Sequence, residues 1–263
     1  MPLVPYFAAL AYLVSAAIGA RTFMAAEDRN PLAPRLLALV AVLLHTGYHA
    51  MVWPDARGAD LHFFAALSLV GLGMAGLSTI IGWQRNLDAL GVVVYPLAVV
   101  TLLLYHHFGH ARTQDLDWRL LLHAWLALLA YATLAIGAVL AILLWVQERA
   151  LRRRRLGPWL RALPPLTQTE ALLFGTLWTG FVLLSATLLS GALFVHDLLS
   201  QHLWHKTVLS VLSWIVFGVL LLGRWRYGWR GGKAVRLTLV AMGLLLLAFF
   251  GSKFVQELLL NYR

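Results

Sequence analysis

Residues 120–146 read LLLHAWLALLAYATLAIGAVLAILLWV, an apolar run without a single acidic or basic residue other than histidine. A helix of about 20 apolar residues crosses the hydrocarbon core of a bilayer, so this run is long enough to span a membrane. Of the 263 residues of the chain, 61% are hydrophobic and only 12% are charged, which is too apolar for a soluble domain. We therefore predict an integral membrane protein.

Seven further apolar runs resemble this one. The sequence lacks the alternating strands of a membrane β-barrel, and helices are the other way to satisfy backbone groups in lipid. The first run has no basic start and no small-residue cleavage site, so we expect a retained helix rather than a signal peptide. We predict an all-α, polytopic membrane protein with a single domain over residues 1–263. It is expected to be a bundle of about eight transmembrane helices at Leu3–Ala20, Leu36–Trp53, Leu61–Trp83, Leu90–Tyr105, Leu120–Val146, Ala171–Val195, Thr207–Gly223 and Leu237–Phe254.

Lysine and arginine are distributed unevenly over the loops. Fifteen of the 21 basic residues follow the first, third, fifth and seventh spans, and they include the run Arg152–Arg155. Positively charged loops stay in the cytoplasm, so both termini are predicted to be periplasmic in a bacterial inner (cytoplasmic) membrane. These loops, in contact with anionic lipids of the bilayer, also explain the net charge of +10. We expect no nucleic-acid partner.

With this orientation, all ten histidines lie on the outer side of the membrane or in the outer parts of helices. Cysteine is absent, which excludes thiol–disulfide exchange, Fe–S clusters and thioether attachment of haem. Imidazole ligates metals and haem iron, so the histidines are the candidate cofactor ligands. The alternative for each is a neutral imidazole that is hydrogen-bonded to another helix or solvated in a loop.

The strongest ligand candidates lie within the membrane or at helix ends. His45 and His49 are four residues apart and share one helix face. An ionisable residue at the depth of His45 is by default a functional hypothesis. His123 lies about one turn inside the fifth span. His196 and His205 flank the short loop between the sixth and seventh spans, where both are able to face one pocket.

This pattern of histidines suits a haem-binding site better than the catalytic zinc site of a hydrolase. Catalytic zinc needs three close ligands and a base, as in a His-Glu-x-x-His helix, which the sequence lacks. Haem needs one or two axial imidazoles and a broad apolar and aromatic surface, to which 11 tryptophans contribute. The cluster of His106, His107 and His110 suits either metal capture or ordinary loop polarity. No Walker, dinucleotide or nucleophile-elbow motif is present, and we do not expect an enzyme.

The closing third of the chain carries the most specific motifs. It contains Leu193-Phe-Val-His-Asp197, His205-Lys-Thr-Val-Leu-Ser-Val-Leu-Ser-Trp214, Gly223-Arg-Trp-Arg-Tyr-Gly-Trp-Arg-Gly231 and Phe249-Phe-Gly-Ser-Lys-Phe254. With His123 in its helix, these motifs resemble the YpjD-type inner-membrane proteins of the cytochrome c assembly superfamily, which includes CcsA, CcmC, CcmF and HemX. The resemblance covers nearly the whole chain.

This resemblance implies a helical bundle that handles haem at the outer face of a bacterial membrane. By this resemblance, His123 corresponds to the histidine that begins a helix before the superfamily's signature loop. His45 matches the early membrane-embedded histidine, and His196 leads into that loop. The Trp-rich loop of haem-delivering members is reduced here to residues 197–205 with a lone Trp204. The shortened loop favours haem binding or passage over ligation of haem to a cytochrome.

We therefore expect a haem-binding or haem-handling inner-membrane protein related to cytochrome c biogenesis. Its expected cofactor is haem, and its expected partners are the lipid bilayer and membrane proteins such as those of cytochrome c assembly. The axial-ligand candidates are His45, His123 and His196, with His205 next. Two alternatives stay open. One is a metal-ion or small-solute transporter with the His106–His110 cluster as its outer capture site, and the other is a non-catalytic membrane scaffold contacted through its arginines.

Overall fold

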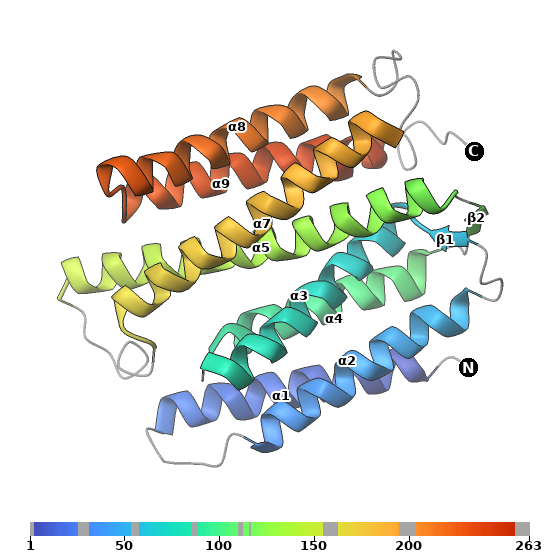
Figure 1. Cartoon of the computed structure of the whole chain (residues 1–263). Helices are drawn as coiled ribbons and strands as arrows, with labels where there is room; N and C mark the ends of the chain where they lie inside the picture. Colours follow the sequence, from blue (N-terminus) through green and yellow to red (C-terminus); the bar gives the residue numbers. More distant parts are fainter. Residues whose placement is uncertain are drawn as a thin grey trace. The chain divides into compact units, whose positions relative to one another are not determined.

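The computed structural model confirms the predicted all-α membrane architecture (Figure 1). It describes residues 3–25, 32–53, 58–85, 89–109, 113–115, 117–154, 163–194 and 204–255. Within these ranges, eight helices are long and apolar enough to cross a membrane. They are α1 Val4–Ala25, α2 Leu32–Val52, α3 Phe63–Arg85, α4 Ala89–Phe108, α5 Trp118–Arg152, α7 Leu166–Phe194, α8 Trp204–Tyr227 and α9 Gly232–Leu246, which continues as the π-helical segment η1 Leu247–Gly251.

Each predicted span coincides with one observed helix, and most of the helices extend beyond it. The seventh span, predicted at Thr207–Gly223, is observed as Trp204–Tyr227. The length of an apolar run underestimates the length of such a helix. Aromatic and basic residues at the membrane interface continue the helix without continuing the apolar run. Two three-residue strands, β1 Gly58–Asp60 and β2 Thr113–Asp115, pair in a small sheet. The sequence did not predict them, because three residues are too few for a periodic pattern.

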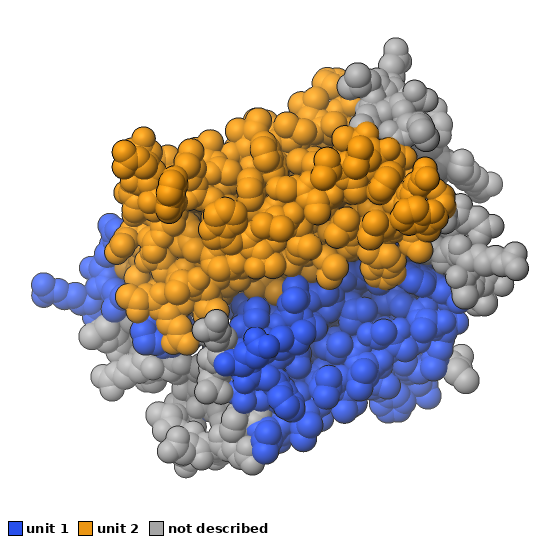
Figure 2. Space-filling model, in the orientation of Figure 1, with its two compact units in different colours: residues 1–114, 149–165 blue, residues 115–148, 166–263 orange. Residues whose placement is uncertain are grey.

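The helices divide into two compact units, coloured separately in Figure 2. Unit 1 contains residues 1–114 and 149–165, and unit 2 contains residues 115–148 and 166–263. The single domain over residues 1–263 stays a prediction.

Small residues allow the helices of unit 1 to approach closely. α1 packs against α2 and α4, and α3 packs against α4. Within this core the rings of Tyr12 and Tyr95 stack with their centroids 5.6 Å apart. Small side chains let membrane helices bring their backbones into van der Waals contact, which drives their association in lipid. The alanines around the two tyrosines are Ala9, Ala16, Ala38, Ala41, Ala75 and Ala98.

An ion pair in unit 2 closes the turn between α8 and α9. Arg224, in the last turn of α8, donates to the carboxylate of Glu170 and to the carbonyl of Trp229 at 3.3 Å. The Trp229 ring lies against Gly223, where a Cβ atom would come within 2.3 Å of it. Gly231 has a φ of +59°, which side chains disfavour. Gly223, Arg224 and Gly231 of the 223–231 motif are therefore explained by this turn.

Two side chains of neighbouring helices bond the backbone of α9. Tyr131 of α5 donates its hydroxyl to the carbonyl of Leu245 at 2.6 Å. Ser213 of α8 donates to the carbonyl of Ala241 at 2.7 Å. These bonds supply donors just before the helix changes to π geometry at residues 247–251, where the regular backbone pattern is interrupted.

The Arg224 contacts generate a stability prediction. Arg224→Ala should lower the free energy of unfolding by about 3 kcal/mol, because it leaves the buried Glu170 carboxylate with only the longer, 3.8 Å contact to the exposed Arg230. Arg226→Ala is the matched control, since Arg226 is an exposed arginine in the same helical turn. Unfolding of the detergent-solubilised variants measures the difference. Equal stabilities of the two variants would contradict the structural role of the ion pair.

Candidate functional site

His123 is held in one orientation by two residues of α7. Its Nδ1 lies 3.0 Å from the Oγ of Ser190, and the Ser190 hydroxyl donates to the carbonyl of Thr187 at 2.9 Å. Because the only hydroxyl hydrogen of Ser190 is used in this way, its oxygen accepts from His123. His123 therefore carries its hydrogen on Nδ1. The lone pair of Nε2 is then available to coordinate a metal ion.

The close approach of His123 to α7 depends on a glycine. A Cβ atom at Gly191 would come within 3.1 Å of Cε1 of the imidazole. The Ser190-Gly191 pair thus supplies both the hydrogen-bond acceptor and the space for the ring. Sequence reasoning did not identify these two residues. The signal that was present is a serine and a glycine side by side in an otherwise apolar helix.

An aromatic and cationic group lies beside His123, where α5 begins and α7 ends. The rings of Trp118 and Phe194 lie 6.2 Å apart. The guanidinium of Arg119 lies 5.5 Å from the centroid of the Trp118 ring and 6.0 Å from that of Phe194. Arg119 and His123 are four residues apart and share one face of α5. This part of unit 2, with the start of α8, is called here the histidine end of unit 2.

One further candidate of unit 2 lies at the start of α8. His205 is half-buried in the first turn of α8, and its ring lies 6.5 Å from that of Trp204. His196 lies outside the described residues, so its ligand assignment stays a prediction.

His45 is in unit 1 and is completely buried. Its Nε2 lies 2.9 Å from the Oγ of Ser68, and its Nδ1 lies 3.5 Å from the hydroxyl of Tyr12. Both ring nitrogens of His45 are therefore engaged within unit 1. This arrangement leaves no nitrogen of His45 free for iron unless one of the two contacts breaks.

His49 shares Ser68 with His45. Its Nε2 lies 3.0 Å from the Ser68 hydroxyl, and the two imidazole rings stack with centroids 5.4 Å apart. Its Nδ1 is buried and has no hydrogen-bond partner among the described residues. The other face of the ring stacks on Tyr105 at 4.8 Å. His49 thus ends a hydrogen-bonded row, and its Nδ1 bonds none of the residues that the structure describes.

An acidic residue lies close to this row, although none was expected there. Asp60 of β1 is fully buried. Its carboxylate is hydrogen-bonded to Nδ1 of His62, and Tyr105 donates to it at 3.5 Å. The sequence places Asp60 in a loop between two apolar runs, whereas in the structure Tyr105 of α4 contacts its buried carboxylate. This part of unit 1, with the ends of α2 and α4, is called here the histidine end of unit 1.

The cluster of His106 and His107 is bonded to tyrosines. His106 Nδ1 lies 2.8 Å from the hydroxyl of Tyr48, and His107 Nε2 lies 3.3 Å from that of Tyr6. His110 lies outside the described residues. In the part of the chain that the structure describes, no three residues of the types His, Cys, Asp and Glu are grouped to hold a metal ion.

The sequence matches one protein family and several individual proteins. The family model described as cytochrome C assembly protein matches residues 33–260. The inner membrane protein YpjD of Escherichia coli (strain K12) is 31% identical over 264 residues, which cover 98% of this chain and 100% of that protein. The protein HemX of Brevibacillus brevis is 26% identical over 196 residues, covering 72% of this chain and 70% of HemX.

A more distant similarity concerns a protein whose name states its function. The cytochrome c biogenesis protein CcsA of Chlamydomonas reinhardtii is 27% identical over 149 residues, covering 56% of this chain and 40% of CcsA. No solved structure matches the chain.

Proposed function

The chain belongs to the cytochrome c assembly protein family, and we propose that it binds haem at the histidine end of unit 2 with His123 as an axial ligand. Membership of the family supports a role related to cytochrome c biogenesis. The proposal adds the cofactor, its position and the residues that hold it.

The orientation of His123 is the observation that carries the proposal. Axial histidines are held by a hydrogen bond from one ring nitrogen, which orients the ring and leaves the other nitrogen for the metal. The bond between His123 and Ser190 meets this requirement, because Ser190 is itself fixed to the backbone of Thr187. Bound haem would offer an open iron coordination position to Nε2 of His123.

The surroundings of His123 suit the rest of a haem molecule. Trp118, Phe194 and Trp125 offer aromatic surface near the end of the helices. Arg119 lies on the same face of α5 as His123 and one turn closer to the helix start. A guanidinium there would bind a propionate carboxylate by a charge-assisted hydrogen bond.

Three further histidines remain ligand proposals of different strength. His205 is half-buried in the first turn of α8, which makes it the described candidate for a second ligand in unit 2. His196 precedes this helix in the sequence and is also proposed as a haem ligand. The two hydrogen bonds of His45 weigh against its role as a ligand, since iron would have to displace one of them.

We place the histidine ends of both units, and both chain termini, on the outer side of a bacterial inner membrane. The distribution of basic residues supports this orientation, since most of them follow helices that end on the opposite side. Haem would then be held near the outer leaflet. The transporter alternative has less support, because His106 and His107 are bonded to Tyr48 and Tyr6. The scaffold alternative stays open.

Ser190→Ala should weaken haem binding about tenfold or more, because supporting residues behind a metal-bound histidine typically contribute 10–100-fold. A titration of the detergent-solubilised protein with haem, followed by its Soret absorption, measures the affinity. Ser185→Ala is the matched control: Ser185 is in the same helix but accepts from Trp214 at 2.8 Å. Unchanged affinity of the Ser190 variant would contradict the role of Ser190.

Arg119→Ala should weaken the binding of haem about tenfold, because it removes one charge-assisted hydrogen bond to a propionate. The same substitution should leave the affinity for haem dimethyl ester unchanged, since the ester has no carboxylate. Comparing the two porphyrins in both proteins isolates this contact from packing effects. An equal loss for both porphyrins would show that Arg119 acts only through packing.

A further inference from the structure

We propose that a small pocket in unit 1 binds the headgroup of phosphatidylethanolamine, a phospholipid that carries a phosphate and a primary ammonium. The pocket lies between α1, α2 and α4, at the end of unit 1 opposite its histidine end. None of the residues that line it takes part in the proposed binding of haem, which concerns unit 2.

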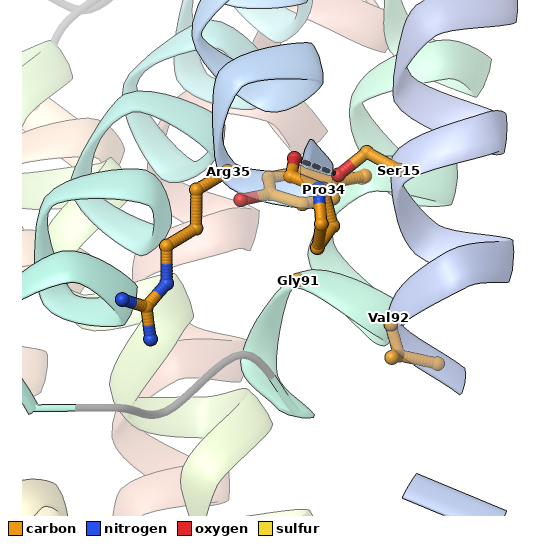
Figure 3. A pocket seen from close by; sticks show the side chains of 7 residues that line it. Ser15, Pro34, Arg35, Gly91 and Val92 are labelled. Atoms are coloured by element: carbon orange, nitrogen blue, oxygen red, sulfur yellow. Dashed lines mark hydrogen bonds between the residues drawn. The ribbon is translucent and has the colours of Figure 1, made fainter. Parts of the chain in front are cut away.

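Three helices form the walls of this pocket (Figure 3). Ser15 and Gly19 come from α1, Arg35 from the first turn of α2, and Val92 and Tyr95 from the first two turns of α4. The centre of the pocket has a free volume of about 10 Å³, which is enough for one water-sized group. A larger ligand therefore has to enter with a single small group and keep its other parts outside.

The most buried polar side chain of the pocket offers a hydrogen-bond acceptor. Ser15 is 2% exposed, and its hydroxyl donates to the carbonyl of Pro34 at 2.7 Å. The only hydrogen of the hydroxyl is used in this bond, so Oγ keeps lone pairs and has no hydrogen left to donate. Among the described residues, none donates to this oxygen. Ser15 therefore favours a ligand group that carries hydrogens, such as an ammonium, over an anionic oxygen.

Arg35 offers the opposite chemistry at the side of the pocket. Its guanidinium carries only donors and a permanent positive charge, which match the oxygens of a phosphate. Figure 3 shows this side chain extending away from Ser15. Arg35 also lies in the first turn of α2, where the helix dipole disfavours a cation, so a phosphate beside it is stabilising. The two side chains thus fit a ligand with a small donor at one end and an anionic group next to it.

Two glycines set the shape and size of the pocket. A Cβ atom at Gly91 would come within 2.4 Å of the Tyr95 ring, so glycine at this position allows the ring to form part of the wall. A Cβ atom at Gly19 would lie 3.5 Å from Cγ2 of Val92, which is an ordinary van der Waals contact, and it would reduce the free space. A primary ammonium is about as large as a water molecule, whereas the trimethylammonium of choline is much larger. We therefore expect the pocket to select ethanolamine over choline.

The pocket lies at the depth of lipid headgroups. α2 and α4 have 21 and 20 residues, so each is about 30 Å long and matches the hydrocarbon core of a bilayer. Their first turns border the pocket and therefore lie at the edge of this core, where lipid phosphates are found. Exposed aliphatic side chains follow along both helices and offer surface to acyl chains. They are Leu36, Leu39 and Leu43 of α2 and Val93, Leu97 and Val100 of α4. These features favour a membrane lipid over a soluble phosphate compound.

Lipid retention, measured by native mass spectrometry, tests the proposal. The full-length protein is equilibrated in mixed micelles that contain equal amounts of phosphatidylethanolamine and phosphatidylcholine with identical acyl chains. In the state with one bound lipid, wild-type protein should retain the ethanolamine lipid about tenfold more than the choline lipid. The reason is that only the primary ammonium both fits the pocket and donates to Ser15.

Two variants of α1 should abolish this preference. Ser15→Ala removes the acceptor, and Gly19→Ala adds a methyl group to the pocket without a clash. Because alanine is more favourable than glycine within a helix, Gly19→Ala should preserve or raise the melting temperature. This variant decides the outcome if Ser15→Ala fails to fold. Ser78→Ala is the matched control and should keep the preference, since Ser78 is a buried serine of unit 1 that bonds none of the described residues.

Arg35→Gln should lower the retention of both lipids about tenfold, because it removes the charge-assisted contact to the phosphate that both lipids carry. Arg21→Gln is the control for the loss of a positive charge. Arg21 is an exposed arginine that lies two residues after Gly19 in α1. It should retain both lipids as the wild type does.

Four results would overturn the proposal. They are equal retention of the two lipids by the wild type, a preference that survives Gly19→Ala, a preference that is lost in Ser78→Ala, and equal losses of lipid in Arg35→Gln and Arg21→Gln. Soluble phosphoethanolamine is added in a separate arm, and displacement of the lipid by an equal amount of it would contradict the assignment to a membrane lipid. Haem binding at His123 is measured by absorption, so failure of either proposal leaves the other untouched.

Discussion

A bilayer offers no water to a buried polar atom, and the arrangement of this protein depends on that constraint. Some polar side chains in its helices bond groups of neighbouring helices instead, and others bond a carbonyl of the preceding turn of their own helix. Tyr131 and Ser213 bond carbonyls of α9, and the Trp214 indole donates to Ser185. Each bond requires its two partners to lie at the same depth, so the bonds also align the helices along the membrane normal.

The two serines that bond His123, His45 and His49 show how this constraint leads to different arrangements. Ser190 has given its hydrogen to a backbone carbonyl, so it fixes His123 in one tautomer and leaves Nε2 ready for a metal. Within the described part of the chain, Ser68 bonds no backbone group and lies between two imidazoles, so either tautomer is accommodated on each side. A fixed tautomer suits a metal ligand, whereas two shared hydrogen bonds hold His45 and His49 in the core of unit 1.

The helices could be predicted from the sequence because apolar length is a local property. The histidine sites could be predicted only in part. The depth of His45 in the membrane indicates a functional residue. Depth alone does not distinguish a histidine that binds a metal from one that is hydrogen-bonded in the core. Only the partners distinguish them, and Ser68 is 23 residues away from His45. Ser190 is 67 residues away from His123, so nothing in the local sequence connects the two. Asp60 lies between two predicted spans, and nothing in the local sequence shows that its side chain is buried.

The central claim is that His123 binds haem iron, and a cavity variant tests it most directly. His123→Gly removes the imidazole and leaves a space that free imidazole fills. The account predicts that haem added to the wild-type protein gives the Soret band of a histidine-ligated iron, that the variant loses this band, and that millimolar-range free imidazole restores it. A variant whose spectrum equals that of the wild type without added imidazole would contradict the claim.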